Sequence, residues 1–132
     1  GWGGNLSRAA HARGIGGTIV DGAARDVDES RDLGYPVYAS AVTPRTARGR
    51  TQEIRWREPI DFAGVTVASD DYVIADSTGV VFIPSVDVDR VLDAAEAIAA
   101  REAAMVTAIA KGVPVSEVMG VGYETLLNGD RP

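Results

Sequence analysis

The chain of 132 residues contains no cysteine, and none of its apolar stretches is long. The absence of cysteine excludes disulfide bonds, thiolate metal sites and a cysteine nucleophile, and it makes the cytoplasm the expected compartment. A membrane-spanning helix needs roughly 20 consecutive apolar residues, and the first residues here do not join a charged region to an apolar signal core. The sequence therefore predicts neither secretion nor insertion into a membrane.

Positive charge is also scarce, because 13 Lys and Arg stand against 19 Asp and Glu and the net charge is -6. Nucleic-acid backbones are bound by clustered Lys and Arg, so direct binding of nucleic acid is not expected, and any RNA-related role would act through a protein partner. A hydrophobic content of 45% with 24% charged residues is ordinary for a globular protein, and the length fits a single domain over residues 1–132.

Three segments have the apolar spacing of helices, and each is stopped by a glycine. They are residues 5–13, Val27 to Leu33, and a long segment that begins at Ser85 or Asp87 and ends at Lys111. Asn5 has the residue type of an N-cap for the first of these helices. One or two short helical turns are expected from Val115 to Leu127, followed by a frayed end at Asn128 to Pro132.

The long helix carries an apolar stripe, which is more typical of a core or subunit contact than of a cofactor surface. The stripe consists of Val91, Ala95, Ile98, Met105 and Ile109.

Six short apolar or alternating runs predict strands. They are Gly17 to Val20, Pro36 to Ser40, Glu53 to Arg57, Val65 to Ala68, Tyr72 to Ala75 and Val80 to Ile83. The last four suggest a compact barrel-like or layered sheet. Asp71 and Asp76 lie in the turns between them, and we interpret both as structural carboxylates that bond neighbouring amides.

The candidate site follows the first strand, where Thr18-Ile19-Val20 ends in Asp-Gly and an arginine flanked by carboxylates comes next. Arg25 offers a planar fork that can hold a carboxylate at two points, and Asp26 offers hard oxygen that suits a divalent cation. The alternative is a surface salt-bridge cluster that opens a helix. Gly3 and Gly4 precede a helix start, where free amides attract anions, or they merely shape a turn.

A second group of charges lies in the segment from Thr43 to Arg50, which lacks an apolar period and is predicted to be a loop. Its three arginines, Arg45, Arg48 and Arg50, could meet an anionic substrate or remain solvated.

The sequence from the first residue to Pro84 resembles the RraA-like family. This family includes 4-hydroxy-4-methyl-2-oxoglutarate aldolases, oxaloacetate decarboxylases and regulators of ribonuclease activity. The family pattern is a glycine or acidic residue, twenty residues, Arg-Asp, two residues, and Glu or Asp. Here it falls on Gly4, Arg25, Asp26 and Glu29. The segments 2–6, 14–22 and 34–39 also look like the family, and the resemblance extends to Pro84.

The resemblance implies an α/β fold in which a layered sheet, similar to that of swivelling phosphohistidine domains, is flanked by helices and followed by a long C-terminal helix. It also implies a homotrimer or homohexamer with sites near subunit boundaries. Family members carry a further segment before the glycine turn, so we expect that a segment is lacking here or is supplied by another chain.

The implied chemistry is cleavage of a carbon-carbon bond in a 2-oxo acid to give pyruvate, with Mg²⁺ or Mn²⁺ as the electron sink. This fits a chain whose single lysine, Lys111, lies at a helix end. By resemblance, Asp26 holds the metal and Arg25 clamps a substrate carboxylate. Glu29 orients Arg25 or a metal-bound water. The substrate would also contact Gly3, Gly4, Asn5 and Leu6, the last two through backbone amides, and Glu102 would reach the site from an adjoining subunit.

Gly4 is the departure from the aldolases of the family, which carry an acidic residue there. A general base contributes about 10² to 10⁴ in rate, so its loss favours oxaloacetate decarboxylation over aldol cleavage. The alternative function is a regulator that binds a ribonuclease or another protein without catalysis. A phosphohistidine-type carrier would depend on His11, which is the only histidine and has the surroundings of an ordinary exposed residue.

Overall fold

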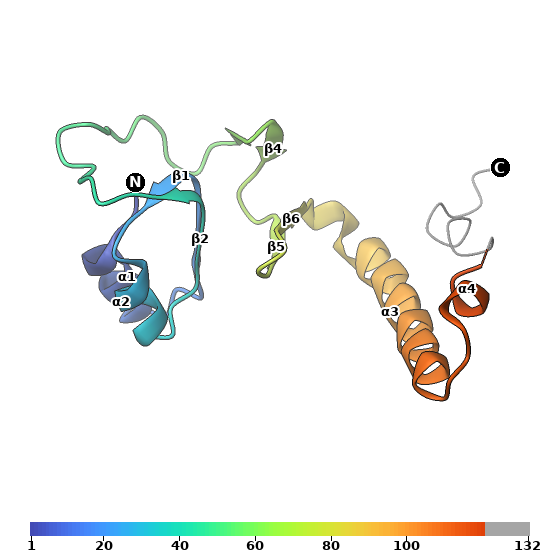
Figure 1. The fold of residues 1–132 in the computed structure, drawn as a ribbon. Helices are drawn as coiled ribbons and strands as arrows, with labels where there is room; N and C mark the ends of the chain where they lie inside the picture. The colour runs from blue at the N-terminus through green and yellow to red at the C-terminus, as the bar shows by residue number, and fades with distance from the viewer. Residues whose placement is uncertain (121–132) are drawn as a thin grey trace. The chain divides into compact units, whose positions relative to one another are not determined.

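A computed structural model describes residues 1–120 and divides the chain into two compact units, Gly1–Pro84 and Ser85–Pro132. The first unit contains two helices and six strands (Figure 1). They are α1 (Gly4–His11), β1 (Thr18–Ala24), α2 (Val27–Asp32), β2 (Val37–Val42), β3 (Ile60–Phe62), β4 (Val65–Val67), β5 (Tyr72–Ala75) and β6 (Val80–Ile83).

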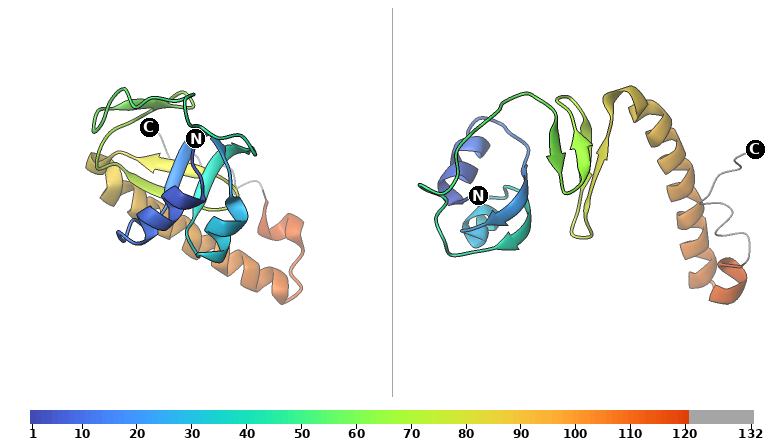
Figure 2. Two further views of the ribbon diagram at one scale, coloured as in Figure 1. Left: turned by 90° about the vertical axis from the view of Figure 1, so that its left-hand side faces the viewer. Right: turned by 90° about the horizontal axis from the view of Figure 1, so that it is seen from above.

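Strands β1 and β2 are parallel, with Thr18 opposite Val37, and α2 forms the crossover between them. This is a βαβ unit, and α1 packs against α2 beside it (Figures 1 and 2). The chain start joins the same sheet, because Trp2 forms a parallel bridge with Ala24. The residues ahead of α1 are therefore fixed next to the carboxyl end of β1.

The other four strands form two antiparallel hairpins, β3-β4 and β5-β6, so the unit contains three two-stranded sheets. Phe62 and Phe82 join the hairpins by an edge contact with ring centroids 5.2 Å apart. The Tyr38 hydroxyl donates to the Ala75 carbonyl at 2.9 Å and links the second hairpin to β2. The predicted α/β class with small layered sheets and a long C-terminal helix is confirmed.

The strand predicted at Glu53 to Arg57 is wrong, and a strand at Ile60–Phe62 was missed. Arg57 has φ of 56°, which breaks an extended run, and its guanidinium lies over the Trp56 ring at 4.7 Å. The β3-β4 turn consists of Ala63 and Gly64, both with positive φ. A two-residue turn with glycine in second place is a hairpin signal, so the Phe-Ala-Gly-Val sequence could have located this strand pair.

The interpretation of Asp71 and Asp76 as turn carboxylates is confirmed. Asp71 accepts the Ala68 amide at 2.8 Å, and Asp76 accepts the amides of Thr78 and Gly79 at 2.7 and 3.2 Å. The two amide donors at Asp76 favour its charged form, and they hold the pKa of this carboxyl below its usual value.

The second unit is described from Ser85 to residue 120. It contains a 3-10 turn (Ser85–Asp87), the 23-residue helix α3 (Val88–Ala110) and the short helix α4 (Val115–Val118). The predicted long helix is confirmed, and it ends before Gly112, which has φ of 89°. Asp87 precedes the helix, but its carboxylate accepts from Arg90 instead of capping a backbone amide. The expected turns beyond residue 120 and the frayed end lie outside the described residues.

Among residues 1–120, no helix combines the length and the apolar character that crossing a membrane requires.

Candidate active site

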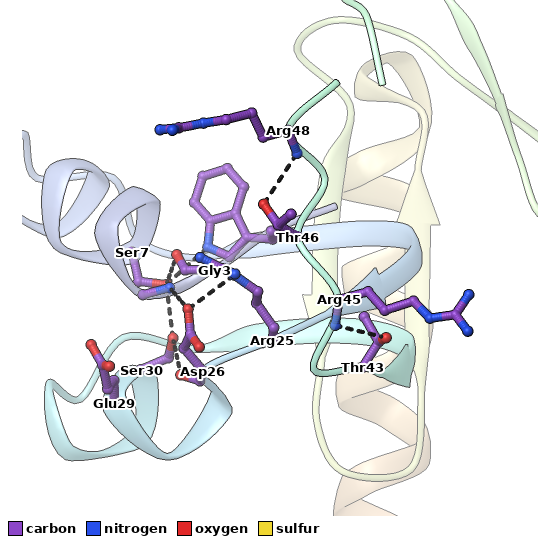
Figure 3. Close-up of polar contacts among 12 residues, drawn as sticks. Gly3, Ser7, Arg25, Asp26, Glu29, Ser30, Thr43, Arg45, Thr46 and Arg48 are labelled. Carbon is purple, nitrogen blue, oxygen red and sulfur yellow. Dashed lines mark hydrogen bonds and ion pairs between the residues drawn. The ribbon is translucent and has the colours of Figure 1, made fainter. Parts of the chain in front are cut away.

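The site begins where β1 gives way to α2. Ala24, the last residue of β1, is buried, and the Arg25 amide donates to the Trp2 carbonyl at 2.9 Å. Asp26 then turns the chain with a left-handed backbone of φ 55° and ψ 39°. Aspartate tolerates this conformation better than most side chains. The turn directs the Asp26 carboxylate back toward the chain start (Figure 3).

The Asp26 carboxylate contacts both the start of α1 and Arg25 through one oxygen. Its Oδ2 accepts the Gly4 amide at 3.0 Å and lies 3.2 Å from Nε of Arg25. Both side chains keep about a third of their surface exposed, 35% for Asp26 and 38% for Arg25. We call Gly3, Gly4, Arg25 and Asp26 the corner.

The predicted capping role of Asn5 is wrong, because Gly3 is the N-cap of α1 and Asn5 lies inside the helix. The Gly4 amide at the helix start is instead satisfied by Asp26, which lies 22 residues further along the chain. The anion that the helix start attracts at Gly4 is thus a carboxylate of the protein itself.

Close approach explains both glycines of the corner. A Cβ at Gly3 would lie 2.9 Å from Nε of Arg25 and 3.0 Å from Oδ2 of Asp26, and one at Gly4 would lie 2.6 Å from an oxygen of Glu29. These separations are shorter than side-chain atoms normally allow. A side chain at position 4 would therefore displace the Glu29 carboxylate.

Glu29 forms an ion pair with Arg8 on α1 at 3.2 Å, and both side chains are more than half exposed. Its Oε2 is the oxygen that lies beside Gly4. No ion pair between Glu29 and Arg25 occurs in the part of the chain that the structure describes, so the expected contact with Arg25 is not formed here. A role toward water beside the corner stays a prediction.

A buried network that the sequence did not reveal supports the corner from behind. Ser7 on α1 has no exposed surface, and its hydroxyl lies 2.7 Å from that of Ser30 on α2. The Trp2 indole N–H donates to Ser7 at 2.9 Å. A buried indole needs an acceptor, so Trp2 was the available signal, but its partner depends on the tertiary fold.

A pocket of about 530 Å³ opens beside the corner. It is lined by Trp2, Gly3, Asn5, Leu6 and Arg25, and also by seven of residues 43–51, which we call the arginine loop. The Leu6 amide already donates to the Gly3 carbonyl at 3.0 Å within the helix start. The structure thus brings Arg25 and three of the four predicted contact residues, Gly3, Asn5 and Leu6, around one cavity, whereas Gly4 and Asp26 are not among its lining residues.

The predicted metal site has few protein donors. The described residues contain no cluster of three or more His, Asp or Glu side chains that could enclose an ion. Asp26 uses Oδ2 for the corner, and within residues 1–120 its Oδ1 has no hydrogen bond or ion pair. Mg²⁺ characteristically binds through one or two carboxylates and keeps several waters. Asp26 therefore fits a magnesium-type ion that is held by a single protein group.

Glu102 lies on α3 in the second unit, and its side chain is exposed. Its expected contribution to the site of an adjoining subunit stays a prediction.

The family model for RraA-like proteins, described as Aldolase/RraA, matches residues 1–82. A 4-hydroxy-4-methyl-2-oxoglutarate aldolase of Thermus thermophilus is 35% identical over 83 residues, which are 62% of this chain and 49% of the relative. The chain spans about half the length of most curated relatives that it matches, and 18% of one of them.

Similar solved structures include the following two. An uncharacterized protein of Pseudomonas syringae has a TM-score of 0.85 at 29% identity, and the match covers 91% of this chain and 60% of that one. An RNA-processing inhibitor from Thermus thermophilus, RraA, has a TM-score of 0.53 at 34% identity, with 63% of this chain and 50% of that one covered.

Proposed function

The chain belongs to the RraA-like family, and from that premise we propose that it is a divalent-metal-dependent lyase that releases pyruvate from a 2-oxo acid. The reaction is either decarboxylation of oxaloacetate or retro-aldol cleavage of a 4-hydroxy-2-oxo acid. The observation that carries the proposal is the corner, where an arginine and an aspartate are locked together beside a pocket. An aldolase among the relatives supports the same reaction class.

In this proposal Arg25 binds the carboxylate of the 2-oxo acid. Only Nε is occupied by Asp26 at 3.2 Å, so the terminal nitrogens remain for a two-point contact with a ligand in the pocket. The pairing with Asp26 also fixes the guanidinium before substrate arrives. A positioned charge avoids the loss of side-chain freedom on binding. The Asn5 amide at the first turn of α1 adds a second donor on the same side.

Asp26 is the residue that would hold Mg²⁺ or Mn²⁺, through Oδ1 or an intervening water. When bound, such an ion supplies a Lewis acid that stabilises the enolate formed as the carbon-carbon bond breaks. The capping bond from the Gly4 amide keeps the aspartate in place.

Glu29 can supply the carboxylate that aldolases of the family carry at the position of Gly4. Because its Oε2 lies where a side chain at position 4 would start, a carboxylate is present at this point despite the glycine. We propose that Glu29 takes up the proton of a substrate hydroxyl or orients a water there. In the absence of such a group, decarboxylation would be favoured over aldol cleavage, since decarboxylation needs no base.

Pyruvate release from oxaloacetate and from 4-hydroxy-4-methyl-2-oxoglutarate, with Mg²⁺ and with excess chelator, tests the proposal. We expect turnover of at least one substrate with Mg²⁺, and its loss with chelator and in Arg25→Lys. In Glu29→Gln, aldol cleavage should fall by about 10² while decarboxylation is kept. Arg31→Lys, an exposed arginine that pairs only with Asp28 within the described residues, is the matched control. Absence of metal-dependent turnover in the assembled protein would contradict the proposal.

Association into a homotrimer or homohexamer belongs to the same proposal, since it would allow Glu102 to reach a neighbouring site. Light scattering gives the mass, and Glu102→Gln should then lower turnover without changing that mass.

The second candidate function is a regulator that binds a ribonuclease, and the similarity to the RNA-processing inhibitor supports it. A regulator would depend on its outer surface and would tolerate loss of the corner. Inhibition of a ribonuclease by wild-type protein and equally by Asp26→Asn, with no turnover by either, would favour this function.

A further inference from the structure

The arginine loop places three guanidinium-bearing residues, Arg45, Arg48 and Arg50, around the pocket that Arg25 also lines. Asp21 is the single carboxylate among the lining residues, and its Oδ2 accepts the Ala63 amide at 3.0 Å. Four arginines and one acidic residue thus line the pocket, although the whole chain has a net charge of -6. Clustered charge of one sign in a cleft raises the local concentration of ligands with the opposite charge.

The three arginines of the loop lack the ion pairs that five other arginines of the described residues form. Ion pairs with carboxylates occupy Arg8, Arg25, Arg31, Arg55 and Arg90. Within residues 1–120, none of the three loop arginines has such a pair. Arg13, Arg57 and Arg101 also lack an ion pair within these residues, but they do not line the pocket. A guanidinium without a carboxylate partner keeps its full fork for a ligand.

The side chains in the loop point in different directions. In Figure 3 the Arg48 side chain runs back toward α1, on the side where Gly3 and Arg25 lie, whereas the Arg45 side chain extends the opposite way. The backbone amide of Arg48 donates to the Thr46 hydroxyl at 3.2 Å, and that of Arg45 donates to the Thr43 hydroxyl at 3.2 Å. Of these two arginines, Arg48 is therefore the one that extends toward the side of the pocket where Arg25 lies.

We propose that Arg48 binds a second carboxylate at the far end of the substrate, so that the pocket selects dicarboxylic over monocarboxylic 2-oxo acids. The inference rests on the proposed function, because it takes the head of the substrate to be held by Arg25. The volume of about 530 Å³ leaves room beyond a three-carbon head and lies in the range of small-molecule sites, about 300 to 1,000 Å³.

The test compares two unreactive ligands with the same five-carbon chain, 2-oxoglutarate and 2-oxopentanoate, which differ in the distal carboxylate. Binding is followed by the fluorescence of Trp2, which lines the pocket, in the full chain carrying Trp56→Phe and in Mg²⁺ buffer. Wild-type loop sequence should bind 2-oxoglutarate more tightly than 2-oxopentanoate. In Arg48→Gln the affinity for 2-oxoglutarate should fall about 10-fold or more, the usual effect of losing a charged hydrogen bond, and that for 2-oxopentanoate should not change.

Two further variants distinguish a direct contact between Arg48 and the distal carboxylate from the general electrostatic attraction of a positively charged pocket. Arg13→Gln removes one positive charge outside the pocket and should leave both affinities unchanged. Arg45→Gln removes one charge from the loop and should lower 2-oxoglutarate affinity less than about threefold, by the modest value of an exposed charge. For oxaloacetate, Arg48→Gln should raise KM without lowering kcat, because the contact stabilises a carboxylate that departs as CO₂.

Three results would overturn the inference. Equal weakening of both ligands by Arg48→Gln, or no weakening of either, would remove Arg48 from the site while leaving the proposed function intact. If Arg45→Gln lowered the affinity for 2-oxoglutarate as much as Arg48→Gln does, the preference would come from the total positive charge of the loop and not from a specific contact with Arg48. If wild-type protein binds neither ligand, the proposed function fails together with the inference.

Discussion

The corner and the arginine loop face the same pocket, but they are held by different kinds of contact. The corner depends on contacts between distant parts of the sequence, such as the Gly4 amide with Asp26 and the Ser7 hydroxyl with Ser30, which are 22 and 23 residues apart. Apart from the Thr43 amide, which donates to the Ala24 carbonyl at the end of β1, the hydrogen bonds that shape the arginine loop in the described residues span two to four residues. The fold therefore fixes the corner, whereas the loop depends on its own local sequence.

This difference separates two tasks within one site. Chemistry requires groups held in one geometry before the substrate arrives, which suits a corner locked by tertiary contacts. Recognition of the rest of the substrate can vary between relatives without disturbing the fold, which suits a loop with local contacts. Changes in the corner should affect turnover and sometimes stability, and changes in the loop should affect ligand preference alone.

The largest effect should come from Asp26→Asn. Asparagine tolerates the left-handed backbone and can still accept the Gly4 amide, so only the charge is lost. Turnover should fall by about 100-fold or more, since even partners of metal ligands cost 10- to 100-fold, while the melting temperature stays within about 3 °C. Asp28→Asn, an exposed neighbour, is the control for the same chemical change. Full activity in Asp26→Asn would remove the corner from the chemistry.

Gly3→Ala tests whether the corner needs its close packing. The added methyl group would lie about as near to Arg25 and Asp26 as a hydrogen-bond partner, so one of them must move. Overpacking of this kind costs about 1 to 3 kcal/mol, and displacement of Arg25 should raise KM about 10-fold. Gly16→Ala is the matched control, because a Cβ there meets nothing within 4 Å. Equal stability and equal KM in the two variants would show that the corner accommodates a methyl group at position 3 without cost.

Ser7→Ala weakens the support behind the corner without touching the pocket. It leaves the half-buried Trp2 indole without its acceptor and the Ser30 hydroxyl without its partner. The free energy of unfolding should fall by about 1 to 3 kcal/mol, measured by urea denaturation. Ser40→Ala, which removes an exposed hydrogen bond to the Gly22 carbonyl, should cost less than about 0.5 kcal/mol. Similar losses in both would mean that the buried network behind the corner adds no more stability than an exposed hydrogen bond between strands.

The smallest effect should come from Asp76, a carboxylate with purely local contacts outside the site. Its folded pKa is below the ordinary 3.8, because the Thr78 and Gly79 amides donate to the charged form. The resulting stabilisation is fully present above pH 3.8 and is lost as the pH falls through the lowered folded pKa. The free energies of unfolding of wild type and Asp76→Asn, measured by denaturation, should therefore become equal below the lowered folded pKa. They should differ slightly at pH 7. If the difference between the two free energies grew as the pH fell, the predicted pH dependence would be contradicted.

The sequence predicted the elements whose signals are local. The helix from Val27 ends where a glycine follows, and Gly34 indeed has φ of 68°. The long helix behaves in the same way at Gly112. The alternation at Glu53 to Arg57 failed because alternation alone does not provide a pairing partner. Extended segments gain stability only through a neighbouring strand, which lies elsewhere in the sequence.

The site was predictable in its residues but less so in its geometry. The Arg-Asp pair and the glycines were identified from their pattern, and the glycines prove to be sites of close approach. The cap on α1 could not be assigned from local sequence. The carboxylate that accepts the Gly4 amide belongs to Asp26, which lies near the chain start only because Trp2 pairs with Ala24 at the end of β1. The pairing of Glu29 with Arg8 likewise depends on how α1 meets α2.

The central claim is that Arg25 and Asp26 together bind the head of a 2-oxo acid. Calorimetric titration of oxalate, which mimics this head, into wild type, Arg25→Lys and Asp26→Asn tests it with and without Mg²⁺. We expect oxalate to bind wild type only with Mg²⁺, and to bind each variant at least about 10-fold more weakly, as for loss of a charged hydrogen bond. Binding that is independent of Mg²⁺ and equal in all three proteins would contradict the claim.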